Sequence, residues 1–387
     1  MRTISDCVKM EICTWFCVGA AALYIFTLLR KLKDGAQGRH WPVALTVALV
    51  GACLYFTESP VFCGLVLLGC SLGLLGEVAR RPELLPVQSR AVLITGCDSG
   101  FGHALAILLS DMRVKVFAGV LDVNGAGAQQ LRERGSENLQ VLQLDVTDSS
   151  QIETARRYIC AQVGDAGLWG LVNNAGIFHC PVEAELHPLF VYRRFMEVNF
   201  LGAVTMCQVF LPLLRRSRGR IVNVSSLAGD VPMPSLAAYG SSKAALKVFS
   251  EVLRLELLVW GVKVTLIQPA GFRTNIFGNK DDRSRYRDEI FSGISSEARQ
   301  DYGDEYISSL LSRLSKMSQQ VTEDLCPVVD NMCHALLSVH PRSVYTPGKF
   351  GWLLPFLHRC CPTAVFDLIS MRMLISTDCE PVGLKRN

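Results

Sequence analysis

The chain of 387 residues has little charge and lacks the patterns of a nucleic-acid or metal protein. Charged residues make up 19% of it and hydrophobic residues 50%. The net charge of +4 comes without a basic cluster interleaved with aromatic residues, so we predict no nucleic-acid partner. Neither the fifteen cysteines nor the seven histidines have metal-site spacing, so we predict no metal. The adjacent Cys360 and Cys361 suit neither a disulfide framework nor a C-x-x-C site, which favours a reducing compartment.

The apolar residues are concentrated in the N-terminal third. Ile12–Leu29 carries no charge and is long enough to cross the ~30 Å hydrocarbon core of a bilayer. Trp41–Phe56 and Val61–Gly76 follow and are marginal in length, so two short crossings or a re-entrant hairpin both remain open. A cleaved signal peptide is the alternative for the first run, and two further apolar runs directly after it argue against that.

The distribution of Lys and Arg predicts an orientation. Basic residues lie between the first and second runs and after the third, and none lies between the second and third. With three crossings, the positive-inside rule places everything after residue 80 in the cytosol. We therefore predict a hydrophobic helical membrane anchor over residues 1–80, a linker over 81–90 that contains Pro82 and Pro86, and a cytosolic catalytic domain.

From Ala91 onward, short apolar runs alternate with helical segments. This pattern predicts an α/β domain over residues 91–350 with a Rossmann-type doubly wound parallel sheet. A loop over 275–318 is expected to wall the substrate pocket. The apolar tail over 351–387 is interrupted by Pro355 and Pro362 and suggests a membrane-dipping cover or a dimer surface. The expected strands are Ala91–Thr95, Lys115–Val120, Leu139–Asp145, Gly170–Asn173, Arg220–Ser225 and Lys263–Gln268.

A glycine-rich turn, Thr95–Gly102, follows the first expected strand. Gly96, Gly100 and Gly102 permit a tight turn and close approach of the backbone to a pyrophosphate, which the N-terminus of the next helix attracts. This strand-turn-helix placement predicts a dinucleotide site.

Asp122 ends the second strand about twenty residues beyond that turn, where a carboxylate can bind the adenosine ribose hydroxyls and repel a 2′-phosphate. Asp98 adds a second negative charge, and no Arg or Lys follows Asp122 closely. Both observations favour NAD over NADP. The alternative is that Asp122 is a solvated turn residue beside Asn124 and Gly125.

Tyr239 and Lys243 are four residues apart and would share one face of a helix. An ammonium group stabilises a nearby phenolate. Lys243 and a bound cationic nicotinamide are therefore expected to lower the tyrosine pKa by about 2–3 units from ~10. Ser226 lies thirteen residues before Tyr239, an offset that distinguishes it from Ser225. Alone, this spacing is also typical of a surface tyrosine and a solvated lysine.

Together these residues resemble the short-chain dehydrogenase/reductase superfamily over about residues 90–345. One departure is Ala270, which stands where the family motif usually has glycine, and Gly271 after it is expected to restore the local flexibility. The matching positions are Thr95–Gly102, Asn173–Gly176, Asn199, Ser226, Tyr239, Lys243 and Pro269–Thr274.

The resemblance implies a role for each catalytic position. Tyr239 would take the proton of a substrate hydroxyl while hydride passes to the nicotinamide, and Ser226 would bind the same oxygen. Lys243 would hold the nicotinamide ribose, and Asn199 would kink its helix and hold a water in a proton relay to Lys243. The alternative for Asn199 is a plain helix-interior residue.

The resemblance also implies further cofactor contacts. Asp145 would contact the adenine ring, and Thr274 would grip the carboxamide. The Asn173–Gly176 motif could instead be purely structural. The other implied cofactor residues are Ser99, Phe101, Val146, Asn174, Ala175, Gly176 and Pro269.

Two strings, Phe117–Leu121 and Tyr345–Lys349, are similar to the hydroxysteroid dehydrogenase branch of the superfamily. That similarity implies NAD-dependent oxidation of a steroid secondary alcohol, with the 17-beta hydroxyl of estradiol and testosterone favoured. It also implies the endoplasmic reticulum membrane and a homodimer paired through the helices of Asn199 and Tyr239. The alternatives are 11-beta-hydroxysteroid or retinol oxidation and, from another class, a non-catalytic membrane scaffold.

Overall fold

The computed structural model describes residues 15–16, 18–27, 64–72, 83–134, 136–278, 280–374 and 379–386. The chain divides into two compact units, Met1–Glu83 and Leu84–Asn387. Each unit is described by itself below.

In the first unit, the described residues include the helix Val18–Thr27 and a helical segment over 64–72. The two pack through Ala20, Tyr24 and Leu67, which are buried. Most of the remaining apolar side chains are exposed, as Trp15 (73%) and Phe26 (59%) illustrate. The predicted run Trp41–Phe56 lies outside the described residues.

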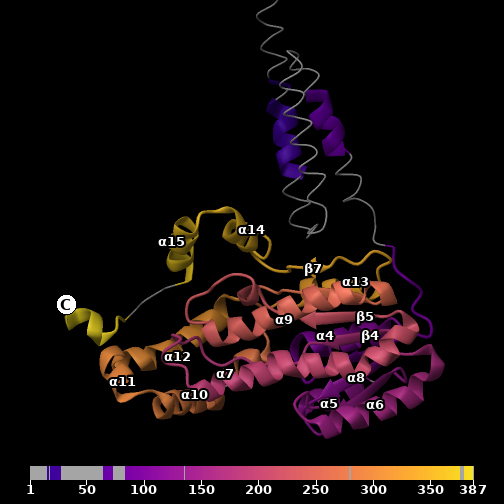
Figure 1. The fold of residues 1–387 in the computed structure, drawn as a ribbon, viewed down its shortest axis with the longest axis horizontal. Helices are drawn as coiled ribbons and strands as arrows, with labels where there is room; N and C mark the ends of the chain where they lie inside the picture. Colours follow the sequence, from indigo (N-terminus) through magenta and orange to yellow (C-terminus); the bar gives the residue numbers. More distant parts are fainter. Residues whose placement is uncertain are drawn as a thin grey trace, which may run out of the picture. The chain divides into compact units, whose positions relative to one another are not determined.

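The second unit contains a seven-stranded, entirely parallel sheet of order β3-β2-β1-β4-β5-β6-β7 (Figure 1). In β1, Leu93 pairs with Phe117 of β2 on one side and with Leu171 of β4 on the other. The strand order reverses between β1 and β4, so the carboxyl ends of these strands open a ligand-binding crevice. The strands are β1 Ala91–Ile94, β2 Lys115–Val120, β3 Leu139–Gln143, β4 Gly170–Asn173, β5 Arg220–Val224, β6 Lys263–Ile267 and β7 Val344–Tyr345.

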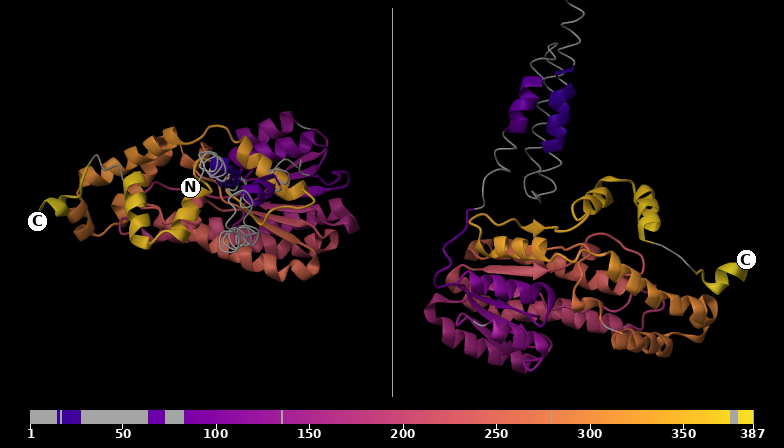
Figure 2. Two further views of the ribbon diagram at one scale, coloured as in Figure 1. Left: turned by 90° about the horizontal axis from the view of Figure 1, so that it is seen from above. Right: turned by 180° about the vertical axis from the view of Figure 1, so that it is seen from behind.

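Helices cover both faces of this sheet (Figures 1 and 2). The α-helices of the second unit are α4 Gly100–Asp111, α5 Ala126–Glu133, α6 Ser149–Val163, α7 Leu189–Met196, α8 Gly202–Ser217, α9 Ala237–Glu256, α10 Lys280–Gly293, α11 Ser296–Tyr302, α12 Asp304–Gln320, α13 Cys326–Leu337, α14 Leu353–Cys360 and α15 Thr363–Leu374.

Alternating residues of each strand enter two separate cores. In β1, Val92 and Ile94 pack with α4, α5 and α13, whereas Ala91 and Leu93 pack with α6, α8 and α9. Successive side chains of a strand point to opposite faces, so a continuous apolar strand builds both layers. The Rossmann-type sheet predicted from the sequence is thereby confirmed.

All six expected strands are present, with ends that differ by at most two residues. The short strand β7 was not predicted, because Val344–Tyr345 is too brief to show a period. The long loop after β6 folds into α10, α11 and α12, which gather beyond one end of the sheet (Figure 2).

One helical stretch among the described residues is long and apolar enough to cross a membrane, Leu189–Ser217. It comprises α7, α8 and the turn between them, and 44% of its apolar window is buried. Its inner residues Met206 and Phe210 belong to the sheet core, so this helix needs no bilayer to cover it. Val18–Thr27 is apolar but shorter.

The apolar tail forms α14 and α15. Phe366 is buried with Leu227 and Val231, and Arg359 binds Asp230 at 2.8 Å. The expectation that Pro355 interrupts the tail is wrong, because it lies in the first turn of α14, where a proline costs no hydrogen bond.

Candidate active site

The glycine turn lies at the carboxyl end of β1 and needs its glycines. Gly96 has φ +68°, and a Cβ there would stand 2.8 Å from the Cα of Ala175. A Cβ on Gly102 would meet the Asn174 side chain at 2.5 Å. A Cβ on Gly100 (φ +62°) would reach Thr274 at 3.2 Å. The turn is therefore packed against two other segments that the sequence assigned to the cofactor.

The Asn173–Gly176 motif ties the ends of β1 and β4 together. The Thr95 hydroxyl accepts hydrogen bonds from the Asn174 and Ala175 amides at 3.1 and 3.0 Å. The Asn174 side chain donates to the carbonyls of Thr95 and Gly96, both at 3.0 Å. Asn174 and Ala175 therefore have the structural function that was the alternative for this motif. Their hydrogen bonds fix the shape of the glycine turn.

The polar side chain of Asn173 points away from the turn and into the sheet core. It donates to Asn223 Oδ1 at 2.8 Å, and Asn223 in turn donates to Ser250 of α9 at 2.8 Å. The sequence analysis did not identify Asn223 or Ser250. They connect β4 and β5 to the helix that carries Tyr239, and only the pairing of Asn173 with Asn223 on adjacent strands could have indicated this.

Two carboxylates meet at the end of β2. Asp98 of the glycine turn accepts hydrogen bonds from the Leu121 amide at 2.9 Å and the Asp122 amide at 3.3 Å. Asp122 is exposed, and its Oδ1 accepts from the Asn124 amide at 2.9 Å. Asp98 therefore positions the strand end, and Asp122 presents a carboxylate toward solvent beside the turn.

The next strand end holds Asp145 and Val146. Asp145 Oδ1 accepts from the amide and the hydroxyl of Thr147 at 2.9 and 2.7 Å. Val146 is buried and packs against α8, where a Cβ on Gly202 would meet it at 2.7 Å. Asp145 is thus held in a turn at the carboxyl end of β3.

The segment after β6 approaches the glycine turn through Thr274, whose hydroxyl accepts weakly from the Ile276 amide (3.4 Å). Pro269 anchors the segment through its carbonyl, which accepts from Leu227 at 2.9 Å. The expectation about Gly271 is wrong, because its φ is not positive. A Cβ there would instead meet Val321 at 2.6 Å, so Gly271 serves close packing.

Tyr239 and Ser226 face each other. The Ser226 hydroxyl is near enough to the Tyr239 phenol to lower its pKa. Ser226 Oγ also accepts a hydrogen bond from the Ala228 amide at 3.2 Å. The preceding Ser225 is buried and donates to the Lys243 carbonyl at 2.8 Å. Only Ser226 therefore presents its hydroxyl beside the phenol.

Lys243 lies one helical turn after Tyr239 and is buried. Its ammonium donates to the Val224 carbonyl at 3.0 Å and stands 5.9 Å from the centre of the Tyr239 ring. Burial lowers the pKa of Lys243 to about 8. A Cβ on Gly176 would stand 3.2 Å from this ammonium, so a glycine there leaves it room.

The expected lowering of the Tyr239 pKa depends on two cations, of which the chain itself supplies only Lys243. Burial raises this pKa to about 12, and the hydrogen bond from Ser226 offsets only part of that rise. Lys243 alone does not lower it, because its ammonium is turned to the Val224 carbonyl and lies beside the ring rather than against the hydroxyl. Any lowering must come from a further positive charge near the phenol.

Asn199 lies in a π-helical turn, η2 (Glu197–Leu201), between α7 and α8. It is buried; its Oδ1 accepts from the Ile177 amide at 2.8 Å, and its Nδ2 donates to the Ile177 carbonyl at 3.1 Å. Nδ2 also lies 3.1 Å from the Ser242 hydroxyl on α9. Such single π turns are frequent at functional sites.

An aromatic wall surrounds Tyr239. The Phe178 ring lies 5.0 Å away and the Phe195 ring 6.0 Å away, both edge-on, and Phe277 packs against Phe178 at 5.9 Å. The sequence analysis missed these residues because they come from three separate segments.

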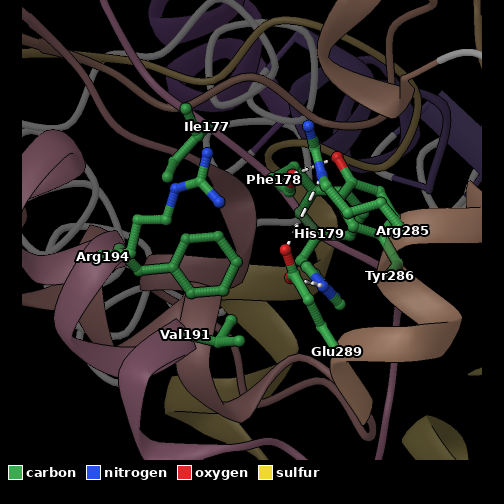
Figure 3. Close-up of a pocket in the computed structure, with 9 residues that line it drawn as sticks. Ile177, Phe178, His179, Val191, Arg194, Arg285, Tyr286 and Glu289 are labelled. Atoms are coloured by element: carbon green, nitrogen blue, oxygen red, sulfur yellow. Dashed lines mark hydrogen bonds and ion pairs between the residues drawn. The ribbon is translucent and has the colours of Figure 1, made fainter. Parts of the chain in front are cut away.

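Beyond Phe178, the structure gathers polar side chains that the sequence analysis treated as ordinary. His179 is buried, and burial together with the positive charges of Arg194 and Arg285 lowers its pKa to about 4. His179, Arg194 and Arg285 line a pocket between α7 and α10 (Figure 3). No group of three His, Cys, Asp or Glu in the described part of the chain could hold a metal ion.

The residues fit a nicotinamide dinucleotide. Glycines stand where a Cβ would fill the turn, and a carboxylate ends the second strand. A serine, a tyrosine and a buried lysine stand where an alcohol could meet that cofactor. This arrangement can bind an alcohol oxygen and accept its proton.

Known proteins are similar to this chain in sequence. The family model described as short chain dehydrogenase matches residues 90–285. Estradiol 17-beta-dehydrogenase 2 of Mus musculus is 43% identical over 92% of this chain and 93% of its own length. The 11-beta-hydroxysteroid dehydrogenase type 2 of Ovis aries is 46% identical over 73% of this chain and 66% of its own.

Solved structures show the same fold. A short-chain dehydrogenase from Streptomyces avermitilis aligns with a TM-score of 0.58 and 24% identity, over 73% of this chain and 97% of its own. A short-chain dehydrogenase/reductase from Burkholderia phymatum in complex with NAD aligns with a TM-score of 0.53 and 22% identity, over 64% of this chain and 85% of its own. The family model covers half of the chain and the mouse relative nearly all of it. The chain therefore belongs to the short-chain dehydrogenase family of oxidoreductases.

Proposed function

We propose that this protein oxidises the 17-beta hydroxyl of steroids such as estradiol and testosterone to a ketone, with NAD as the hydride acceptor. The observation that carries the chemistry is the placement of buried Lys243 one helical turn after Tyr239, with its ammonium 5.9 Å from the centre of the Tyr239 ring. Ser226 lies near the same phenol and lowers its pKa. The names of the two relatives support a steroid alcohol as the substrate.

In this mechanism the substrate hydroxyl lies between Ser226 and Tyr239. Ser226 orients the oxygen, and Tyr239 accepts its proton as the carbon loses hydride. A bound nicotinamide would supply the hydride acceptor and a positive charge near the phenol. This charge together with Lys243 opposes the burial that raises the tyrosine pKa. Asn199, tied to Ile177 and Ser242, would position a water that links Lys243 to solvent.

The choice of a 17-beta hydroxyl as the substrate group rests on how much of this chain each relative matches. The estradiol-named relative aligns over 92% of this chain, whereas the 11-beta-named relative aligns over 73%. Microsomes that contain the protein, given NAD, are expected to convert estradiol to estrone faster than they oxidise cortisol or retinol. Formation of no estrone would remove this proposal, and oxidation of cortisol or retinol alone would favour the corresponding alternative.

A non-catalytic membrane scaffold is the candidate from another class. Asn199, Ser226, Tyr239 and Lys243 are all present, and Asn199 and Lys243 both lie beside Gly176, whereas a relic would be free to lose one of the four. Any turnover that depends on Tyr239 excludes this candidate.

For the cofactor, Asp122 and Asp98 favour NAD, because two carboxylates beside the ribose would repel a 2′-phosphate. Asp122→Arg is expected to shift the ratio of kcat/KM for NAD over NADP toward NADP by about tenfold or more, since it removes one like charge and adds an opposite one. Steady-state rates with each cofactor measure this ratio. Asp111→Arg, at the far end of α4, is the control. An unchanged ratio in Asp122→Arg would reject its role.

We infer that residues 1–80 anchor the protein in the endoplasmic reticulum membrane with the catalytic domain in the cytosol, joined through the linker 81–90. The exposed apolar side chains of Val18–Thr27 support an environment other than water, because Ile25 and Phe26 are 55% and 59% exposed. Protease added to sealed microsomes should digest the part after residue 90. Survival of that part would reverse the orientation.

A homodimer is proposed through α8 and α9. Val248, Val252 and Leu255 form an exposed apolar stripe on α9, at a spacing that places them on one face. Crosslinking in membranes should capture a pair of chains, and a Val252→Glu chain that still pairs would argue against this surface.

A further inference from the structure

A small pocket lies one aromatic layer away from Tyr239. Its wall includes the rings of Phe178 and Phe195, which both pack edge-on against the Tyr239 ring. It also includes Ile177, whose backbone holds the Asn199 side chain. The pocket is therefore built on the segments that position the proposed catalytic residues.

The pocket holds about 100 Å³. Sites that enclose a whole drug-sized ligand have roughly 300–1,000 Å³. The pocket is thus too small for a whole steroid and has room for only one end of such a molecule.

On the α10 side of the pocket, the charged groups satisfy one another. Arg285 binds Asp282 at 2.9 Å and Glu289 at 3.7 Å. Glu289 also binds His179 Nε2 at 3.1 Å, and Cys180 Sγ lies 3.1 Å from the other ring nitrogen of His179. Arg285 therefore already has two carboxylate partners, so it is not free to bind an acceptor oxygen of a ligand.

Arg194 faces this network from α7, across the pocket (Figure 3). Within the part of the chain that the structure describes, its guanidinium has no ion pair and no hydrogen bond. A guanidinium is always charged and only donates hydrogen bonds, so it selects acceptor atoms. The apolar residues Ile177, Val191 and Phe195 beside it favour a lipophilic body around that acceptor.

We propose that Arg194 is a specificity residue that binds an acceptor oxygen, a carbonyl or a hydroxyl, at the end of the substrate remote from the reacting alcohol. This assignment rests on the proposed function and adds to it the second polar feature that the substrate must carry. A lipophilic alcohol without that remote oxygen would be turned over less efficiently.

The test compares two substrates of the full-length, membrane-bound protein with NAD. One is a 17-beta-hydroxysteroid with a 3-keto group, and the other is the same steroid without oxygen at position 3. The readout is the ratio of their kcat/KM values. Arg194→Met is expected to lower the ratio of kcat/KM for the 3-keto steroid over the steroid without oxygen at position 3 about tenfold, because it removes one hydrogen bond to a charged group. The KM for NAD should be unchanged. Arg194→Lys should keep part of the preference.

Arg193→Met is the matched control, because Arg193 is the neighbouring arginine on α7, exposed as Arg194 is, and does not line the pocket. It should keep the wild-type ratio. An equal ratio in wild type and Arg194→Met, with both substrates oxidised, would overturn the role of Arg194 and leave the proposed function intact. Failure of the wild-type protein to oxidise either steroid would instead remove the proposed function, and this assignment with it.

Discussion

Tyr239→Phe is expected to lower kcat/KM for alcohol oxidation about a thousandfold, within the range that a positioned general base contributes. Phenylalanine keeps the ring that packs against Phe178 and Phe195, so the fold and the aromatic wall should persist. Only the phenol oxygen that meets Ser226 is lost. Steady-state oxidation of estradiol measures the effect, and NAD binding followed by fluorescence should be unchanged.

Tyr158→Phe is the control for this change. Tyr158 lies on α6, and its hydroxyl binds Gln140 at the surface, away from the proposed site. It should retain wild-type rates. Activity of Tyr239→Phe within tenfold of wild type would exclude Tyr239 as the proton acceptor.

Lys243→Met should lower kcat/KM about a hundredfold or more, because it removes the one buried ammonium beside the phenol within the described chain. Methionine fills much of the same space without charge. The KM for NAD should rise as well, since the lysine is proposed to hold the nicotinamide ribose. Lys247→Met, one turn further along α9 and paired with Asp230 at 3.0 Å, is the control and should keep the wild-type KM for NAD. Wild-type kinetics in Lys243→Met would contradict its role.

The same variant makes a pH prediction for the cofactor-free protein. The pKa of Lys243 is about 8 in the fold and 10.5 as an ordinary lysine, so the unfolded chain binds the extra proton between these values. The free energy of unfolding of the wild type should therefore rise with pH from about 8 to 10.5, by about 3 kcal/mol from this residue. Lys243→Met should lack that rise in denaturant unfolding followed across this range. Equal pH profiles would show that burial does not disfavour the charged lysine.

The sheet could be predicted from the sequence because its strands are continuous apolar runs between helical segments. The parallel sheet buries both faces of β1 and β5. Their sequences therefore lack the alternation of apolar and polar residues that marks a strand with one exposed face. The glycine turn was equally visible, since only glycine fits at Gly96 and Gly102. By contrast, β7 is two residues long and pairs with β6 only after the whole substrate loop has intervened.

The candidate site was predictable where one short segment carries the chemistry, as Tyr239 and Lys243 do on α9. It was not predictable where chemistry depends on packing. The rise in the Tyr239 pKa comes from burial, which the sequence does not display. The pocket lined by Arg194 and Glu289 lies between α7 and α10, and these two residues are nearly a hundred positions apart in the sequence. His179, which looked ordinary in the sequence, is brought into it by the fold.

The most direct test is a crystal structure of the protein with NAD and a non-reacting analogue of a steroid alcohol. The oxygen of the analogue should lie within hydrogen-bond distance, about 2.6–3.2 Å, of both Tyr239 Oη and Ser226 Oγ, with its carbon facing the nicotinamide. An analogue bound with its oxygen away from Tyr239, or a Tyr239 hydroxyl turned from the nicotinamide, would contradict the account.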